Sequence, residues 1–224
     1  MKIAPRALIA LSVAILPGLA SAATIQLTNA DFSVGTDPLA TGWLQVNGGG
    51  TPGSPSNYAE IVPNIGNRSM QIKSDGGNYV QQTISLSEFG AVDAGTFSSY
   101  TVAFDYGYRR DSVRNGDHTL RISLWNVTDD VEVTGADLVI ADPGTTGANS
   151  LAPGSFVLSY DNTAASLAGD TIAIRFTSMS ADLGTNAWQR TAIIDNVAIT
   201  AVPEPAAALA GALGLLGLLR RRRC

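Results

Sequence analysis

Apolar and polar residues alternate along the central part of this chain, and this two-residue period is the feature that most limits its fold. Three stretches show it best, namely Thr101–Tyr108 (TVAFDYGY), Thr119–Val127 (TLRISLWNV) and Thr171–Ser178 (TIAIRFTS). Such alternation is expected when one face of a β-strand is buried and the other is exposed. A helix would need a period near 3.6 residues, and the middle of the chain does not show one.

Shorter segments also have the composition of strands, and clusters of Gly, Pro, Asn, Asp and Ser separate them. These segments are Thr24–Thr28, Trp43–Val46, Tyr58–Val62, Arg68–Lys73, Tyr79–Ser85, Leu138–Ala141, Phe156–Tyr160 and Thr191–Thr200. Many short strands, regular turns and no internal repeat predict one all-β domain, an antiparallel β-sandwich, rather than a propeller or a solenoid. The pattern leaves the order of the strands open.

The first 22 residues have the layout of a secretory signal peptide. Lys2 and Arg6 precede the apolar run Ala7–Leu16, and small residues ending in Ala22 follow. This order of charge, apolar run and A-x-A site predicts a signal helix, export by the Sec machinery, and cleavage by signal peptidase after Ala22.

The end of the chain combines a Pro-rich motif, an apolar run and an arginine cluster. The motif is Val202, Pro203, Glu204 and Pro205, the run is Ala206–Leu219, and the cluster is Arg220, Arg221, Arg222 and Arg223. A helix needs about 20 apolar residues to cross the hydrocarbon core, so this run is short. The arginines would hold its end in the cytoplasm. We therefore predict a hydrophobic C-terminal helix that enters the membrane transiently, with a lasting tail anchor as the alternative.

This tail resembles the PEP-CTERM sorting signal of Gram-negative bacteria, over residues 202–224. The resemblance implies that an exosortase-type transpeptidase of the inner membrane recognises and cuts the VPEP motif. It further implies a mature protein at the cell surface or in the extracellular matrix, associated with exopolysaccharide or biofilm. The predicted organisation is thus a signal peptide (1–22), a β-sandwich (23–201) and a sorting signal (202–224).

The segment between the two terminal signals is acidic and has no cysteine. Six of the 14 Lys and Arg residues lie in the terminal segments, but only one of the 19 Asp and Glu residues does, which leaves a net charge of about −10. This charge argues against nucleic acid and anionic membrane surfaces as partners. The one cysteine is Cys224, so the middle of the chain can form no disulfide and has no thiol nucleophile.

A second resemblance covers nearly all of residues 23–201. It rests on five short motifs, Asn29–Phe32 (NADF), Gly42–Trp43 (GW), Gly77–Ile84 (GNYVQQTI), Tyr100–Phe104 (YTVAF) and Ile194–Ile199 (IDNVAI). Their order is similar to that in the jelly-roll β-sandwiches of carbohydrate-binding modules and galactose-binding-like domains. The resemblance implies a jelly-roll fold and, in many such domains, a structural calcium ion between the opening loop and the last strand.

Asp31 and Asp195 match the acidic positions of that calcium site. Ser33 and Asn196 depart from the pattern, because acidic residues would be expected there. Calcium prefers six to eight oxygen ligands with several carboxylates. The alternative is that Asp31 caps a turn and Asp195 bonds the backbone.

Candidate glycan-binding residues follow from the predicted strand faces. If the apolar residues of Thr119–Val127 and Thr171–Ser178 point inward, the outer faces present Arg121, Trp125 and Arg175. We expect Asp105 to join them from the neighbouring strand. A Trp ring can stack on a sugar while charged groups bond its hydroxyls. An ordinary outer face with an Asp–Arg pair is the alternative.

No motif indicates catalysis. The only histidine is His118, in a predicted turn, and neither a G-x-S-x-G elbow nor an H-E-x-x-H zinc motif occurs. Paired carboxylates for glycoside hydrolysis stay open, since nothing selects a pair. We expect an exported, non-enzymatic surface or matrix protein with no cofactor apart from a potential structural calcium. The alternatives are a specific carbohydrate-binding module centred on Trp125 and a weak polysaccharide hydrolase.

Overall fold

The fold is described from a computed structural model. It describes residues 22–36, 39–46, 57–61, 68–74, 77–84, 97–109, 116–142, 150–159, 167, 169–180 and 191–203. The predicted signal helix and hydrophobic C-terminal helix lie outside these residues. Within the described ranges, no helix is long and apolar enough to span a bilayer.

Every regular element in the described ranges is a β-strand. The strands are β1 (Ala23–Ile25), β2 (Gly35–Thr36), β3 (Leu39–Ala40), β4 (Leu44–Val46), β5 (Asn57–Ile61), β6 (Arg68–Lys73), β7 (Tyr79–Thr83), β8 (Phe97–Tyr108), β9 (His118–Asn126), β10 (Val131–Ile140), β11 (Ala152–Ser159), β12 (Ile172–Ser178) and β13 (Thr191–Pro203).

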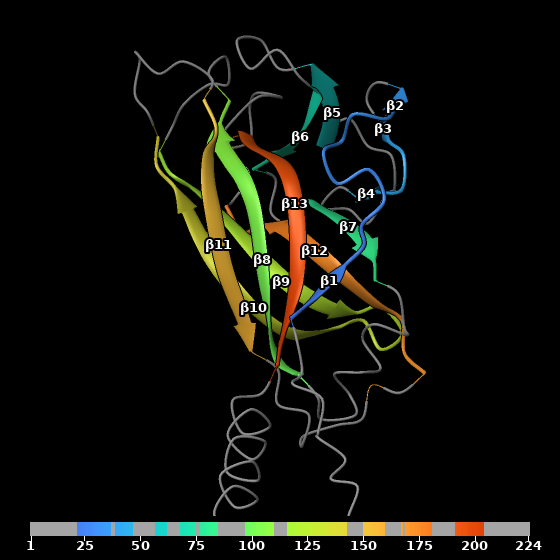
Figure 1. Ribbon diagram of the computed structural model, residues 1–224. Helices are drawn as coiled ribbons and strands as arrows, with labels where there is room; N and C mark the ends of the chain where they lie inside the picture. The colour runs from blue at the N-terminus through green and yellow to red at the C-terminus, as the bar shows by residue number, and fades with distance from the viewer. Residues whose placement is uncertain are drawn as a thin grey trace, which may run out of the picture. The chain divides into compact units, whose positions relative to one another are not determined.

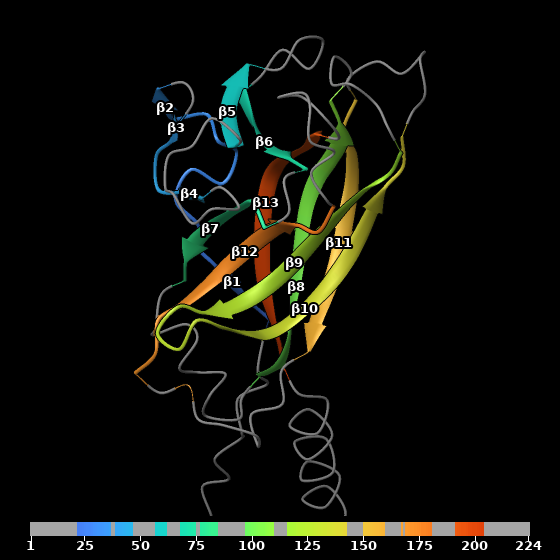
Figure 2. The ribbon, with the colours of Figure 1, turned by 180° about the vertical axis from the view of Figure 1, so that it is seen from behind.

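Two antiparallel sheets pack face to face (Figure 1). The six-stranded sheet has the order β11-β8-β13-β6-β5, and β1 pairs with the second half of β13. The five-stranded sheet, nearer the viewer in Figure 2, has the order β10-β9-β12-β7-β4. The chain passes from one sheet to the other at most connections, as in a jelly roll. The predicted antiparallel β-sandwich is therefore confirmed.

The inner faces of the two sheets form one apolar core. The predicted inward faces of β9 and β12 are confirmed, because Leu120, Ile122, Leu124, Ile172, Ile174 and Phe176 are all fully buried. The rings of Phe104 on β8 and Phe176 meet edge to face across the core, with centroids 5.1 Å apart. Burying an aliphatic or aromatic side chain of this size contributes about 1.5–3 kcal/mol, so these residues dominate the stability of the sandwich.

The opening loop closes one end of the core. Asn29 fixes this loop, because its side-chain amide donates to the carbonyls of Val34 (2.7 Å) and Thr41 (3.0 Å) and accepts from the Val34 N–H (2.8 Å). The loop buries Phe32 against Trp43, with ring centroids 4.9 Å apart. The NADF and GW motifs therefore have a packing role here.

The last strand, β13, contains a β-bulge that contacts the opening loop. The pairing of β13 with β8 shifts between Asp195 and Ala198, and Asn196 has a left-handed backbone (φ 51°). The Val197 N–H then donates to the carbonyl of Ala30 (3.0 Å). Bulges of this kind redirect side chains locally, and this one turns Asn196 outward and Val197 into the core.

Candidate carbohydrate-binding face

The candidate face is the outer surface of the five-stranded sheet. A single cross-strand row passes through its middle, from Gln81 on β7 through Arg175 on β12 and Ser123 on β9 to Gly135 on β10. Side chains directly opposite each other on adjacent strands are the closest neighbours on a sheet face. This row therefore sets which groups surround Arg175.

The Arg175 guanidinium is held between two aromatic rings. Its central carbon lies 3.7 Å from the Trp125 ring centroid and 4.0 Å from that of Tyr79. Trp125 pairs in register with Ala173, and Tyr79 pairs with Thr177. Ala173 and Thr177 are small, so the Trp125 ring can extend over Ala173, and the Tyr79 ring over Thr177, to reach the guanidinium. Both rings are half-buried, so part of each stays available.

Burial and one hydrogen bond fix the orientation of Arg175. The side chain is only 6% exposed, and its Nε donates to the Gln81 Oε1 at 2.8 Å. Desolvation lowers the pKa of Arg175, because burial disfavours the charged form. An arginine remains charged at neutral pH even so. The face therefore carries a nearly buried cation that its neighbours hold in one plane.

The edge of the Trp125 ring is anchored by the turn between β9 and β10. Its Nε1 donates to Asp130 Oδ1 at 3.1 Å, and Asp130 has a left-handed backbone (φ 55°). Asn126 organises the same turn, since its Oδ1 accepts from the N–H groups of Thr128 (2.9 Å) and Asp129 (3.2 Å). These hydrogen bonds fix the position of the indole.

Arg121 has a different environment from Arg175. It forms a two-bond ion pair with Glu132 (2.6 and 3.0 Å) and a further one with Asp137 (3.0 Å). The hydrogen bonds that Arg121 donates to Glu132 first, and then to Asp137, raise its pKa. The ion pair lies over Gly135, where a Cβ atom would come within 2.9 Å of the Arg121 Nε. The Arg121 guanidinium is thus already paired with two carboxylates of the protein itself.

Asp105 lies on the other side of the molecule. The prediction that it joins Arg121, Trp125 and Arg175 from a neighbouring strand is wrong, because β8 belongs to the six-stranded sheet, between β11 and β13. The pattern gives the outer face of a strand but not the sheet to which it belongs. In place of Asp105, the structure brings Tyr79, Gln81 and Ser123 to the candidate face.

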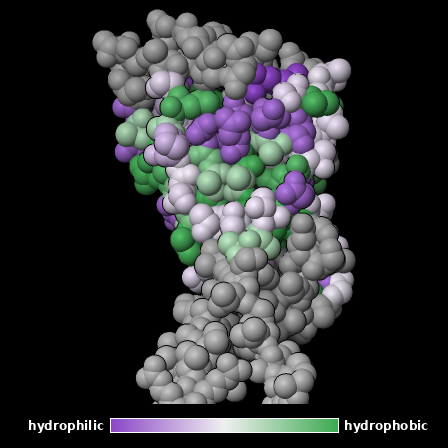
Figure 3. All heavy atoms as spheres, in the orientation of Figure 1, coloured by the Kyte–Doolittle hydropathy of each residue, from purple (hydrophilic) through white to green (hydrophobic). Residues whose placement is uncertain are grey.

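On the outer face of the six-stranded sheet, Asp105 pairs in register with Asp195. Asn196 Nδ2 donates to Asp105 at 2.8 Å, and the fully buried Asp195 accepts from Ser69 Oγ (3.0 Å) and the Asn196 N–H (2.8 Å). Figure 3 shows hydrophilic residues gathered in a band across this side of the molecule. These contacts give the two carboxylates a structural role in the bulge.

The predicted calcium residues have protein partners. Asp31 Oδ1 accepts from the N–H (3.2 Å) and hydroxyl (2.9 Å) of Ser33, and Asp195 is held as described above. Among the described residues, no group of three or more His, Cys, Asp or Glu could hold a metal ion. Calcium binding by Asp31 and Asp195 stays a prediction. Thermal melting with EDTA and with added calcium tests it, since a bound ion stabilises the folded state by mass action.

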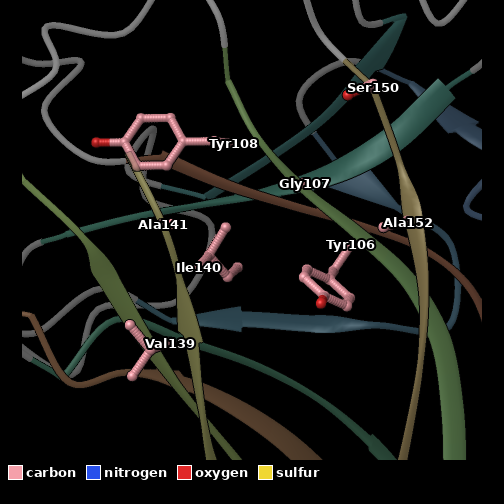
Figure 4. Close-up of a pocket in the computed structure, with 8 residues that line it drawn as sticks. All are labelled: Tyr106, Gly107, Tyr108, Val139, Ile140, Ala141, Ser150 and Ala152. Atoms are coloured by element: carbon pink, nitrogen blue, oxygen red, sulfur yellow. The ribbon is translucent and has the colours of Figure 1, made fainter. Parts of the chain in front are cut away.

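A pocket of about 310 Å³ opens where β8, β10 and β11 approach each other (Figure 4). It is lined by Tyr106, Gly107, Tyr108, Val139, Ile140, Ala141, Ser150 and Ala152. No lining residue is a carboxylate or an imidazole. The Tyr108 hydroxyl donates to the carbonyl of Gly116 at 3.2 Å. The pocket therefore presents hydroxyl groups and apolar walls, with no acid–base pair.

His118 and part of the sorting motif lie in strands. The predicted turn at His118 is wrong, because this residue begins β9 and is fully buried. Val202 and Pro203 are the last residues of β13 and pair with Ser99 and Phe97. The remaining motif residues, Glu204, Pro205 and Arg220–Arg223, lie outside the described residues.

Comparison with known proteins supports the fold. No family model matches the chain, and no curated protein is significantly similar to it. A cyclase from Fischerella sp. TAU has a TM-score of 0.53 at 17% identity, with 82% of this chain and 98% of the cyclase covered. The arabinose-bound α-L-arabinofuranosidase MgGH51 has a TM-score of 0.53 at 13% identity. It covers 80% of this chain, which spans only 26% of the enzyme's length.

Carbohydrate-binding modules are also among the similar structures. The CBM22-1 xylan-binding domain of Paenibacillus barcinonensis Xyn10C has a TM-score of 0.46 at 11% identity, with 83% of this chain and 95% of that domain covered. At these identities the comparisons establish a shared fold, for which the matches with a TM-score above 0.5 are sufficient. One fold can host many functions, so the fold alone does not determine the function of this protein.

Proposed function

We propose that this protein is an exported, non-enzymatic carbohydrate-binding protein whose ligand lies on the outer face of the five-stranded sheet. The single observation that carries this proposal is the stack of Tyr79, Arg175 and Trp125, which is half-buried, rigidly anchored and open on one side of the sandwich.

The chemistry of this face suits a sugar chain. Sugars offer apolar C–H faces, which pack on aromatic rings, and hydroxyl groups, which bond to fixed polar groups. Trp125 and Tyr79 supply the rings, while Thr83 and Thr177 supply hydroxyls beside them. An open strand surface with two aromatic groups is better suited to an extended polymer than to a small enclosed ligand.

The same observations favour binding over catalysis. A general acid or base must reach the substrate, but His118 is fully buried. The carboxylates nearest Trp125 are occupied, since Glu132 pairs with Arg121 and Asp130 accepts from the indole. The fold itself does not decide the question, because both a cyclase and an arabinofuranosidase share it.

The setting of this function is the cell surface or extracellular matrix of a Gram-negative bacterium. The signal peptide at residues 1–22 and the PEP-CTERM-like tail at residues 202–224 support export, transient insertion in the inner membrane and processing by an exosortase-type enzyme. In this setting the natural ligand is an exopolysaccharide of the matrix or biofilm, and the acidic middle of the chain makes nucleic acid an unsuitable partner.

Calorimetric titration with soluble oligosaccharides tests the binding function. The full chain is kept in a detergent without a sugar headgroup, so that the detergent does not compete. We expect at least one glycan to bind, and Trp125→Ala to weaken this binding at least tenfold, or about 1.4 kcal/mol, because Trp residues are frequent hot spots.

Two further variants make the result specific. Trp125→Phe keeps an aromatic ring and should retain more affinity than Trp125→Ala. Val157→Ser, at a residue that is 62% exposed and lies on β11 in the other sheet, should bind as the unaltered chain does. If no oligosaccharide binds, or if Val157→Ser abolishes binding while Trp125→Ala does not, the proposal is wrong.

A further inference from the structure

Arg175 is a nearly buried cation without a carboxylate partner among the described residues. Arg175 contacts the two aromatic rings and Gln81, and no ion pair or hydrogen bond of its terminal nitrogens occurs in the described part of the chain. The polar atoms that are both fully buried and unpaired do not include these nitrogens, so they still reach solvent. A buried charge without a partner is costly.

The surroundings of Arg175 leave only one of its edges open. Tyr79 and Trp125 both place a ring within about 4 Å of the guanidinium carbon, and Gln81 occupies the Nε–H. The two terminal nitrogens remain as a planar, fixed pair of donors. Such a pair matches the two oxygens of a carboxylate in a bidentate arrangement. Because the rings already hold the plane, little side-chain freedom would be lost on binding.

Ser123 provides a second, independent unpaired group beside this edge. Its hydroxyl is fully buried and has no hydrogen-bond partner, and it stands directly opposite Arg175 in the register of β9 and β12. Leaving a buried hydroxyl unpaired costs about 1–3 kcal/mol. An acceptor group that lies against Arg175 from the β9 side would satisfy both residues together.

Arg121 provides an internal comparison on the same face. Its guanidinium already contacts Glu132 and Asp137, so it has a protein carboxylate in the place where Arg175 has none. The acidic residue near Arg175 is Asp130, which accepts the indole N–H of Trp125 instead. Asp130 therefore acts on Arg175 only through space, and no carboxylate among the described residues contacts its terminal nitrogens.

We infer that Arg175, with Ser123, binds the carboxylate of a hexuronate unit within the glycan of the proposed function, on which this inference rests. A sugar is favoured because the aromatic rings that hold the guanidinium also offer surfaces for its C–H groups. At this position a singly charged group such as a carboxylate is favoured over a phosphate dianion, because the sandwich carries about −10 net charge. Screening over about 8 Å at physiological ionic strength leaves the local pair effective.

A matched pair of ligands tests the inference without any variant. Trigalacturonate and its fully methyl-esterified form have the same sugar rings, but only the first carries carboxylates. We expect the full chain to bind the acid at least tenfold more tightly than the ester, as measured by calorimetry. This preference should shrink as sodium chloride is raised, since salt screens the ion pair.

Variants then assign the preference to Arg175. Arg175→Gln should remove it, and Arg175→Lys should retain only a small part, because an ammonium group cannot form the bidentate pair. Val157→Ser is the matched control and should keep the full preference. Circular dichroism and thermal melting establish whether each variant is folded. If Arg175→Gln does not fold, the comparison of the two ligands in the unaltered chain remains decisive.

The outcomes separate this inference from the proposed function. Equal affinity for acid and ester overturns the carboxylate assignment, while binding of either still supports a glycan-binding face. If binding depends on Trp125 but is confined to neutral oligosaccharides, the carboxylate assignment is likewise overturned and the glycan-binding face is still supported. Tighter competition by inorganic phosphate than by free glucuronate also overturns the carboxylate assignment. If no oligosaccharide binds and glucuronate does not change the tryptophan fluorescence, both the inference and the proposed function are overturned.

Discussion

At the scale of single residues, Arg121 and Arg175 show how neighbours decide what an arginine can do. Both project from the same sheet face, but Arg121 is half-exposed and paired with Glu132 and Asp137, whereas Arg175 is nearly buried between rings. The first residue contributes little to stability, because exposed ion pairs are worth about 0–1 kcal/mol. The second retains donors that can recognise a ligand.

The carboxyl of Asp31 allows a prediction about acid stability. The side-chain hydrogen bond from Ser33, and then its backbone N–H, lower the pKa of Asp31 below its ordinary value. A lowered folded-state pKa means that this contribution is present above the unfolded-state pKa and is lost as the pH falls through the folded-state value. Since Asp31 is exposed, the effect on unfolding should be small.

The measurement is an NMR titration of the Asp31 carboxyl in the unaltered chain and in Ser33→Ala. We expect the midpoint to lie below the ordinary range for aspartate and to move upward in Ser33→Ala, which keeps the backbone N–H and removes the hydroxyl. Ser155→Ala, on an exposed part of β11, serves as the control. An unchanged midpoint in Ser33→Ala would contradict the assigned cause.

At the scale of structural elements, the opening loop depends on one side chain. Asn29 makes three hydrogen bonds across the loop and also adopts a left-handed backbone (φ 52°), which asparagine tolerates better than most residues. We expect Asn29→Ala to destabilise the fold by about 2–4 kcal/mol, because each lost bond is worth about 1 kcal/mol and alanine is strained at this φ.

A glycine variant separates the two contributions. Asn29→Gly loses the same hydrogen bonds but adopts positive φ without strain, so it should be about 1 kcal/mol more stable than Asn29→Ala. Urea unfolding of both variants, followed by Trp fluorescence, measures the difference. Were Asn29→Ala the more stable of the two, the backbone argument would be wrong.

Edge strands mark the limit of what the pattern predicts at this scale. Leu138–Ala141 and Phe156–Tyr160 are correctly predicted as strands, but β10 begins at Val131 and β11 at Ala152. The missed halves contain Glu132, Asp137 and a bulge in β10, and Pro153 and Gly154 in β11. Charges, bulges and proline are typical of edge strands. The composition of these segments therefore does not indicate a strand, although each segment pairs with a neighbouring strand.

The candidate face was predictable only in part for a related reason. A two-residue period indicates that Trp125 and Arg175 point away from the core, and the structure confirms that they share a face. The period carries no information on which strands are neighbours, so the prediction that Asp105 joins them is wrong. The sequence could have predicted that Tyr79 points outward, since YVQQT alternates Tyr79 and Gln81 against Val80. Its position beside β12 can be learned only from the tertiary fold.

At the scale of the whole molecule, the proposed sorting reaction can be checked on the exported protein. We expect intact-mass spectrometry to find a new N-terminus at Ala23 and a new C-terminus between Pro203 and Pro205. The motif begins within β13, since Val202 and Pro203 pair with Ser99 and Phe97. A cut after Pro203 would therefore leave this strand paired to its end.

Substitution of the motif provides the control for this reaction. Pro203→Ala together with Pro205→Ala should leave the apolar run attached and the product in the membrane fraction, while Val157→Ser should be processed normally. An exported species of full mass that still carries Cys224 would contradict the sorting proposal.

The pairing of the first strand with the last also determines how this domain can be rewired. Ala23 stands opposite Ala201 in the β1–β13 ladder, so the two ends of the sandwich emerge side by side. A linker of a few residues could join them, but a new start should avoid the turn after Asp129, because Asp130 in this turn anchors the Trp125 indole. The sandwich is thus suited to circular permutation, which would present the five-stranded sheet at a different distance from a fused partner.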